Sequence, residues 1–186
     1  MNRRNSRKME AQIQNRRKKT DSLLIPHSED MADIDDTPFK MMGKKVVFPS
    51  NLQPKILGRD TVAEVLKNPG YKIITFADAA GCNICRLNFF GWKLLIAESK
   101  EWKEPVDFVF IIQPGSELSS ILDFYDFYFP VFYDENASFI RKNRLSTDPQ
   151  LQTFLINPEN KIVLAGYPVA NKILWNRYKK IIENQF

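Results

Sequence analysis

The chain has 186 residues, enough for one domain with a full hydrophobic core and some additional sequence. Hydrophobic residues make up 44% and aromatic residues 12%, which favours a packed globule over a disordered chain. The formal net charge of +5 comes entirely from the first twenty residues, and no stretch of about 18 apolar residues occurs, which excludes a transmembrane helix.

Residues 1–42 divide into a basic arm and an acidic linker. The arm, residues 1–20, carries eight Lys or Arg and one acidic residue, and it contains no aromatic residue that could stack on a base. We therefore expect no nucleic-acid partner. The composition favours a solvated tether that is flexible or helical, and peripheral contact with an anionic membrane surface is the alternative. The folded domain is expected over residues 43–186.

The first residues are too polar for the apolar core of a signal peptide. For the chain as it stands we expect a cytoplasmic location. A periplasmic or membrane-tethered location is the alternative if a signal segment precedes Met1. The oligomeric state is not indicated by the sequence.

Three segments before residue 78 have strand or helix patterns. Residues 44–48 predict a short strand closed by Pro49, and residues 61–66 predict a short helix or strand that ends at Asn68-Pro69-Gly70. Residues 71–77 are rich in β-branched and aromatic side chains, which predicts a strand.

Helix and strand patterns alternate over the rest of the chain. A helical apolar spacing predicts a helix from Cys82 to about residue 100, and the continuous apolar run 106–112 predicts a buried strand. The later elements are a helix over 117–127 with Ser116 as its N-cap, a strand over 129–133, a helix over 136–142, a hairpin of strands 152–157 and 161–165, and a helix over 169–183. This order predicts an α/β domain with a mixed central sheet flanked by helices. The aromatic cluster of residues 124–133 is predicted to pack mainly into its core.

Cys82 and Cys85 are the only cysteines, and they follow the strand predicted over residues 71–77. Cys-x-x-Cys beside a βα unit is typical of a thioredoxin-like redox motif. At the start of a helix the unpaired amide groups stabilise a thiolate, which lowers the pKa of the first cysteine. Cys82 is therefore the candidate nucleophile, and Cys85 is the candidate resolving thiol that attacks the mixed disulfide. No bound cofactor is needed for this chemistry.

Two other interpretations of the cysteine pair stay open. A structural zinc site needs four ligands, and the only histidine, His27, lies in the linker, so a dimer would have to share four cysteines around zinc or an iron–sulfur cluster. A purely structural disulfide is the other alternative. A loop closed by so short a bridge removes little chain entropy, so stability is a weak reason for it.

The order of elements, with Cys-x-x-Cys between the first core strand and its helix, resembles the thioredoxin fold over roughly residues 44–184. Phe129-Pro130-Val131-Phe132-Tyr133-Asp134, with the later run Thr153-Phe154-Leu155-Ile156-Asn157 and Lys161-Ile162-Val163, is similar to the pattern of TlpA/ResA-like proteins. Gly81 to Leu87 with Trp92-Lys93 is similar to thioredoxin-like proteins of Bacteroidetes, many of which are exported. The resemblance implies a thioredoxin-like domain with a charged N-terminal extension. It also implies thiol–disulfide oxidoreductase activity on protein or small-molecule disulfides, with thiol-bearing proteins or small thiols as partners.

Departures from the family pattern fall at the site itself. The buried carboxylate that the family places six positions before the first cysteine falls on Phe76, so Asp78 is the candidate proton relay. The loop that would carry a cis-proline facing the cysteines has Leu151, Gln152 and Thr153 instead. We expect a trans bond there, because a non-proline cis peptide costs about 2.5–4 kcal/mol. A non-catalytic thioredoxin-like binding module is therefore the alternative function.

Overall fold

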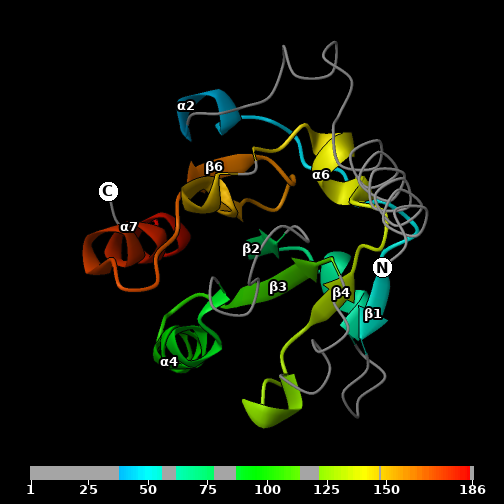
Figure 1. Ribbon diagram of the computed structural model, residues 1–186. Coiled ribbons are helices and arrows are strands. Elements are labelled where there is room, and N and C mark those ends of the chain that lie inside the picture. Colours follow the sequence, from blue (N-terminus) through cyan, green and yellow to red (C-terminus); the bar gives the residue numbers. More distant parts are fainter. Residues whose placement is uncertain (1–37, 56–61, 78–86, 114–121, 147, 185–186) are drawn as a thin grey trace, which may run out of the picture. The chain divides into compact units, whose positions relative to one another are not determined.

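The computed structural model describes residues 38–55, 62–77, 87–113, 122–146 and 148–184 (Figure 1). By its contacts the chain divides into residues 1–34 and residues 35–186, and the described residues all belong to the second unit. None of the described helices is long and apolar enough to cross a membrane.

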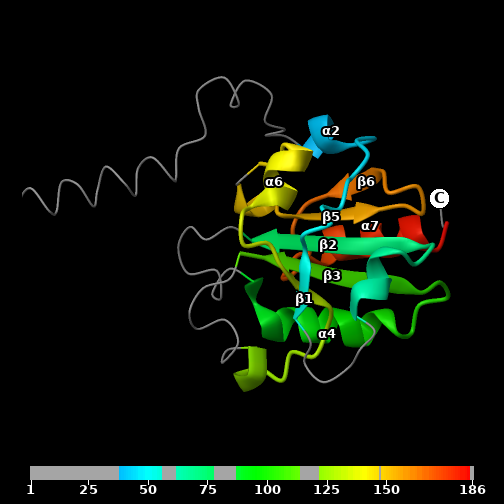
Figure 2. The same ribbon diagram turned by 90° about the vertical axis from the view of Figure 1, so that its right-hand side faces the viewer.

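The described residues form a six-stranded mixed sheet with the strand order β1-β4-β3-β2-β5-β6 (Figure 2). The neighbours β2, β3 and β4 are parallel, whereas β1, β5 and β6 pair antiparallel with their neighbours. The strands are β1 (Gln53–Lys55), β2 (Tyr71–Ala77), β3 (Val106–Ile112), β4 (Val131–Tyr133), β5 (Thr153–Ile156) and β6 (Ile162–Ala165). The predicted mixed sheet flanked by helices is confirmed.

The centre of the sheet follows the sequence pattern closely. The predicted strands 71–77 and 106–112 are β2 and β3, which pair in register from Tyr71 opposite Val106 to Ala77 opposite Ile112. Both strands are mostly apolar because each is covered on both faces, as expected for a parallel pair. The predicted hairpin is also present, as β5 and β6.

Alternation along the strands separates two layers of core. Side chains of Ile73 and Phe110 point toward the layer that contains α4 (Phe89–Ser99) and α7 (Lys172–Ile182). Side chains of Ile74 and Phe76 point toward the opposite layer, which holds Phe139 of α6 (Ser138–Asn143) and Met41 of α2 (Pro38–Met41). Figure 1 shows α4 and α7 on one side of the sheet and α6 on the other.

The helix predicted to run continuously from Cys82 is interrupted at Asn88. The backbone of Asn88 is left-handed (φ 41°, ψ 61°), and its side chain accepts a hydrogen bond from the Gly91 amide at 3.0 Å. Asn88 is thus the N-cap of α4, which starts at Phe89. The prediction missed this boundary because the apolar spacing continues on both sides of Asn88. The helix nevertheless begins after Asn88, because an Asn side chain readily bonds nearby backbone amide groups in place of the helical pattern.

The segment 44–48 is not a full strand. Only Lys45 forms a bridge, with Lys161 next to β6. The amide and carbonyl of Val47 are bonded to the side chain of Asn143 instead, both at 2.8 Å, which ends the pairing. The helix predicted over 117–127 ends before Asp126, whose φ of 48° is left-handed.

Smaller differences occur at the ends of other elements. The strand predicted over 129–133 begins at Val131, and α7 begins at Lys172, because Asn171 caps it by accepting from the Leu174 amide at 3.0 Å. Residues 62–66 form a 3-10 helix, η1 (Val62–Leu66). The edge strand β1 was not predicted, since Pro54 weakens a strand pattern and is tolerated only at a sheet edge.

Candidate active site

A pocket of about 170 Å³ lies where β2 ends. The carboxyl ends of parallel strands are the usual place for a site in an open α/β sheet. Residues from the end of β2, the start of β5 and three loops line it: Thr75, Phe76, Ala77, Leu87, Pro149, Gln150, Gln152, Thr153 and Tyr167.

The predicted thiol pair itself lies outside the described residues, as does Asp78. Residues on both sides of the undescribed segment 78–86 line the pocket, however. Ala77 precedes it and Leu87 follows it. The roles of Cys82, Cys85 and Asp78 stay predictions.

Thr75 and Thr153 form a buried pair of hydroxyl groups in the pocket. They face each other across β2 and β5, with their Oγ1 atoms 3.1 Å apart. Thr75 is 3% exposed and Thr153 is fully buried. Strand alternation directs both side chains toward the layer of α4 and α7, the side of Ile73 and Leu155.

Phe76, the position counted six residues before Cys82, points away from this layer. It borders the pocket, but its ring packs against Phe139 and Phe154, with centroids 6.1 Å from each. At this end of β2, Thr75 is the polar residue whose side chain points toward the layer of α4 and α7. A sequence signal for it existed, because Thr75 interrupts the apolar residues 73–77 and Thr153 directly precedes the apolar residues 154–156.

The loop expected to face the cysteines contains a helical turn, η2 (Pro149–Leu151). Its amide groups donate within the turn: Gln150 to Asp148 Oδ1 and Leu151 to the Asp148 carbonyl, both at 2.9 Å, and Gln152 to the Pro149 carbonyl at 3.5 Å. All described peptide bonds are trans, which confirms the expectation for this loop.

The structure separates the three residues predicted for this loop. Gln152 and Thr153 line the pocket, whereas Leu151 packs into the opposite core layer. The Gln152 carbonyl accepts a hydrogen bond from the Phe76 amide at 2.9 Å, which fixes the loop to the end of β2.

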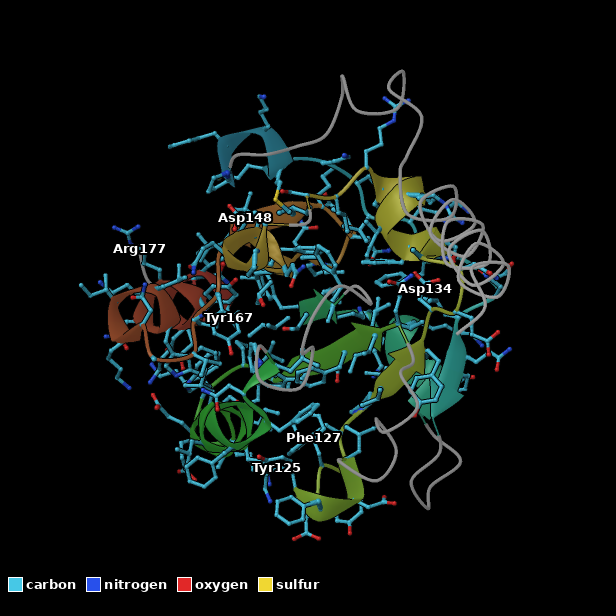
Figure 3. The ribbon with its side chains drawn as sticks, viewed as in Figure 1. Tyr125, Phe127, Asp134, Asp148, Tyr167 and Arg177 are labelled. Atoms are coloured by element: carbon cyan, nitrogen blue, oxygen red, sulfur yellow. The ribbon has the colours of Figure 1, made fainter. Side chains whose placement is uncertain are left out.

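Tyr167 closes another side of the pocket and was not predicted. Its hydroxyl group donates to the carbonyl of Leu87 at 3.5 Å, and burial raises its pKa to about 12. The hydroxyl therefore stays protonated near neutral pH. Figure 3 shows Tyr167 between the central strands and α7. Among the described residues no group of three or more His, Cys, Asp or Glu side chains could hold a metal ion.

Solved structures with the same arrangement of strands and helices exist. A thiol:disulfide interchange protein from a Bacteroides species matches 76% of this chain and 91% of its own with a TM-score of 0.54 and 15% identity. The domain has a thioredoxin-like fold. A protein of Chlorobium tepidum assigned as the thiol:disulfide interchange protein DsbE gives a TM-score of 0.52 at 17% identity over 73% of this chain and 93% of its own. A cysteine-to-serine mutant of PrxQ from Xylella fastidiosa gives 0.54 at 17% identity over 75% and 96%.

No protein-family model matches the sequence, and no curated protein does. The thioredoxin-like fold is thus shared with proteins of very different sequence, including two thiol:disulfide interchange proteins. Fold alone does not establish activity, because one fold hosts many functions.

Two sequence features of the thioredoxin-like domain have structural explanations. Asp134 of the Phe-Pro-Val-x-x-Asp pattern is 2% exposed and caps α6, accepting from the amide groups of Ser138 and Phe139 at 2.8 Å each. Of the aromatic cluster, Phe127 and Phe132 are in the core as predicted, but Phe124 and Tyr128 are exposed.

Proposed function

We propose that the protein is a thiol–disulfide oxidoreductase in which Cys82 attacks and Cys85 resolves. The observation that carries this proposal is the pocket that both Ala77 and Leu87 line. The Cys-x-x-Cys segment connects these two residues, and two peptide units keep the Cα atoms of Cys85 and Leu87 within about 7.6 Å of each other. The thioredoxin-like fold supports the same chemistry.

The reaction has two exchange steps. The Cys82 thiolate attacks a disulfide of the substrate, forming a mixed disulfide and releasing one substrate thiolate. The Cys85 thiolate then attacks the Cys82 sulfur, forming the Cys82–Cys85 disulfide and releasing the second substrate thiolate. The substrate disulfide gains two electrons, and the protein dithiol loses them.

Thiol-bearing proteins and small-molecule thiols are the proposed partners. Side chains from the described lining are uncharged near neutral pH: three aromatic or aliphatic groups, two amides, two hydroxyls, a proline and Tyr167. Such a lining suits an uncharged segment next to the substrate disulfide better than a charged one, since it offers no counter-ion.

The proposal is tested by measuring the reduction potential of the full chain in glutathione and dithiothreitol buffers, with mass-shift alkylation to count free thiols. A reversible two-electron transition between about −120 and −270 mV is expected, the span of known exchange catalysts. A pair that shows no transition there would contradict the proposal.

Single substitutions separate the two roles. Cys82→Ser should abolish turnover of an insulin or glutathione disulfide, and Cys85→Ser should accumulate a mixed disulfide that mass spectrometry detects. Ser99→Ala is a matched control, because Ser99 is buried in the same domain and its hydroxyl donates to the Ile96 carbonyl at 2.8 Å. Wild-type turnover by either cysteine variant would rule out these roles.

A non-catalytic binding module is the second candidate. The η2 turn favours it, because its amide groups already donate within the turn and so are not available to pair with a substrate backbone. A partner that the Cys82→Ser/Cys85→Ser double variant still captures as well as wild type, with no redox transition in the wild-type protein, would favour this function.

A further inference from the structure

The two hydroxyl groups of the Thr75–Thr153 pair carry two protons, and only one of these protons can be donated within the pair. Each hydroxyl group carries one donor proton and can accept two hydrogen bonds. One of the two donates to the other across the 3.1 Å contact. In the described part of the chain the second proton has no acceptor, although both side chains are at least 97% buried.

The pocket is the place where this second proton can find an acceptor. Both threonines line it, and β2 and β5 hold them on rigid neighbouring strands. A buried donor without an acceptor costs about 1–3 kcal/mol, so an acceptor in the pocket would be favoured. In surroundings as apolar as Leu87 and Ala77, a hydrogen bond to an anion is stronger than in water.

We propose that the Thr75–Thr153 pair donates a hydrogen bond to a thiolate sulfur in this pocket and stabilises the thiolate over the thiol. This inference rests on the proposed function, which places thiol chemistry at the end of β2. The thiolate has two possible sources: the Cys82–Cys85 pair of the chain itself, or the substrate thiolate that leaves during exchange. The threonines are positioning residues, since a hydroxyl group cannot keep the proton that a thiol releases.

The neutral pair acts differently from a buried carboxylate. A carboxylate would raise the pKa of a nearby thiol by charge repulsion, whereas a hydroxyl donor lowers it. Tyr167 is the one titratable side chain in the described lining, and it stays uncharged below its pKa of about 12. Within the described pocket no charge therefore competes with the threonine pair.

The experiment compares wild type with Thr75→Val/Thr153→Val in the full chain. The rate of iodoacetamide alkylation of the reduced protein, measured against pH, gives the thiol pKa values. We expect the double variant to raise one thiol pKa by about one unit, a tenfold loss of thiolate below that pKa. Above the thiol pKa the reduction potential should become more negative by about 30 mV, which is the same tenfold change converted for two electrons.

Matched controls separate this role from packing. Thr75→Ser/Thr153→Ser keeps both hydroxyl groups and should keep the wild-type pKa, and Ser99→Ala removes a buried hydroxyl elsewhere. If the double valine variant does not fold, Thr75→Val and Thr153→Val are measured singly. The second source, the leaving substrate thiolate, is tested with oxidised glutathione. The rate constant for its reaction with the reduced protein is divided by the fraction of the protein thiol that is ionised, which gives the corrected rate.

Each outcome decides the inference. A raised thiol pKa places the donor on the chain's own thiolate, and an unchanged pKa with a corrected rate about tenfold lower places it on the substrate thiolate. Unchanged pKa and unchanged corrected rate overturn the inference. Alkylation needs no turnover, so a wild-type protein without a redox transition would end the proposed function while the pKa comparison still decides the role of the threonines.

Discussion

Gly91 of α4 and Val169 of the loop before α7 lie so close that a methyl group on Gly91 would overlap the Cγ1 atom of Val169. The same methyl group would come within 2.9 Å of the Asn88 side chain, which caps the helix. The contact sets how closely α4 can approach the loop that carries Tyr167, and so it shapes one side of the pocket.

Gly91→Ala should therefore destabilise the protein. Alanine gains about 1 kcal/mol of helix propensity, but overpacking costs about 1–3 kcal/mol, so we expect a net loss of up to about 2 kcal/mol. The urea midpoint, followed by fluorescence of the buried Trp92, Trp102 and Trp175, measures it. Val169→Ala removes the clashing methyl group. In a double-mutant cycle the pair should show a favourable coupling, and purely additive effects would contradict the close contact.

Phe76→Ala should cost about 3–5 kcal/mol of unfolding free energy, because the ring is 1% exposed and packs between Phe139 and Phe154. Conservative replacement by leucine should cost less. Neither change should move a thiol pKa as Thr75→Val/Thr153→Val does, since the Phe76 ring points to the opposite layer. A thiol pKa that depends on Phe76 and not on the threonines would contradict this assignment of faces.

Asp134→Ala should lower the unfolding free energy by about 2–3 kcal/mol, because a buried carboxylate accepts hydrogen bonds from two amide groups and the Ser138 hydroxyl. Asp134→Asn keeps one acceptor oxygen and should lose less. The exposed cap Asp148 provides the matched control, and Asp148→Ala should cost about 1 kcal/mol. Equal losses at both positions would show that burial of the cap has no influence.

The buried hydroxyl group of Tyr178 should make the protein less stable at alkaline pH. This hydroxyl donates to the Gly166 carbonyl at 2.8 Å, and burial raises its pKa far above the ordinary 10, as it raises the pKa of Tyr167 to about 12. Above pH 10 the unfolded chain releases these protons and the folded chain keeps them. The unfolding free energy should then fall by up to about 1.4 kcal/mol per pH unit for each tyrosine.

Urea midpoints of wild type and Tyr178→Phe between pH 9 and 11 measure this effect. The variant should be less stable by about 1 kcal/mol at pH 8 but should lose stability less steeply above pH 10. Burial lowers the pKa of Lys72, so the contribution of Lys72 to the unfolding free energy rises as pH approaches 10.5. This contribution is the same in wild type and variant. Parallel pH profiles would contradict the raised pKa of Tyr178.

The central elements could be predicted because burial dictates their residues. The β-branched and aromatic residues of β2, the apolar run of β3 and the hairpin residues around Asn157 specify strands with little competition. The thioredoxin-like fold followed from their order. The strand predicted over residues 44–48 was wrong because Asn143, almost a hundred residues away along the chain, takes the hydrogen bonds of Val47.

The site was harder to predict than the fold. Counting back from Cys82 put the family's carboxylate position on Phe76 and left Asp78 as the candidate relay, and it did not point to Thr75. Pairing of β2 with β5 places Thr75 beside Thr153. Tyr167 reaches the pocket from a loop 80 residues after Leu87, and no local pattern marks such a contact. Asn88 was missed because a cap and a polar helix residue look alike in sequence.

Leu151→Pro tests whether the η2 turn can adopt the conformation of the loop that carries a proline at this place in thioredoxin-like proteins. The Leu151 amide donates to the Asp148 carbonyl at 2.9 Å, and proline would remove that donor. Leu151→Ala keeps the amide and loses only the buried side chain, at about 2–5 kcal/mol. We expect the proline variant to be less stable than the alanine variant by a further 1–3 kcal/mol, about the cost of the lost hydrogen bond and the disturbed turn. A proline variant more stable than the alanine variant, with faster disulfide exchange, would instead mean that this loop readily adopts the family conformation.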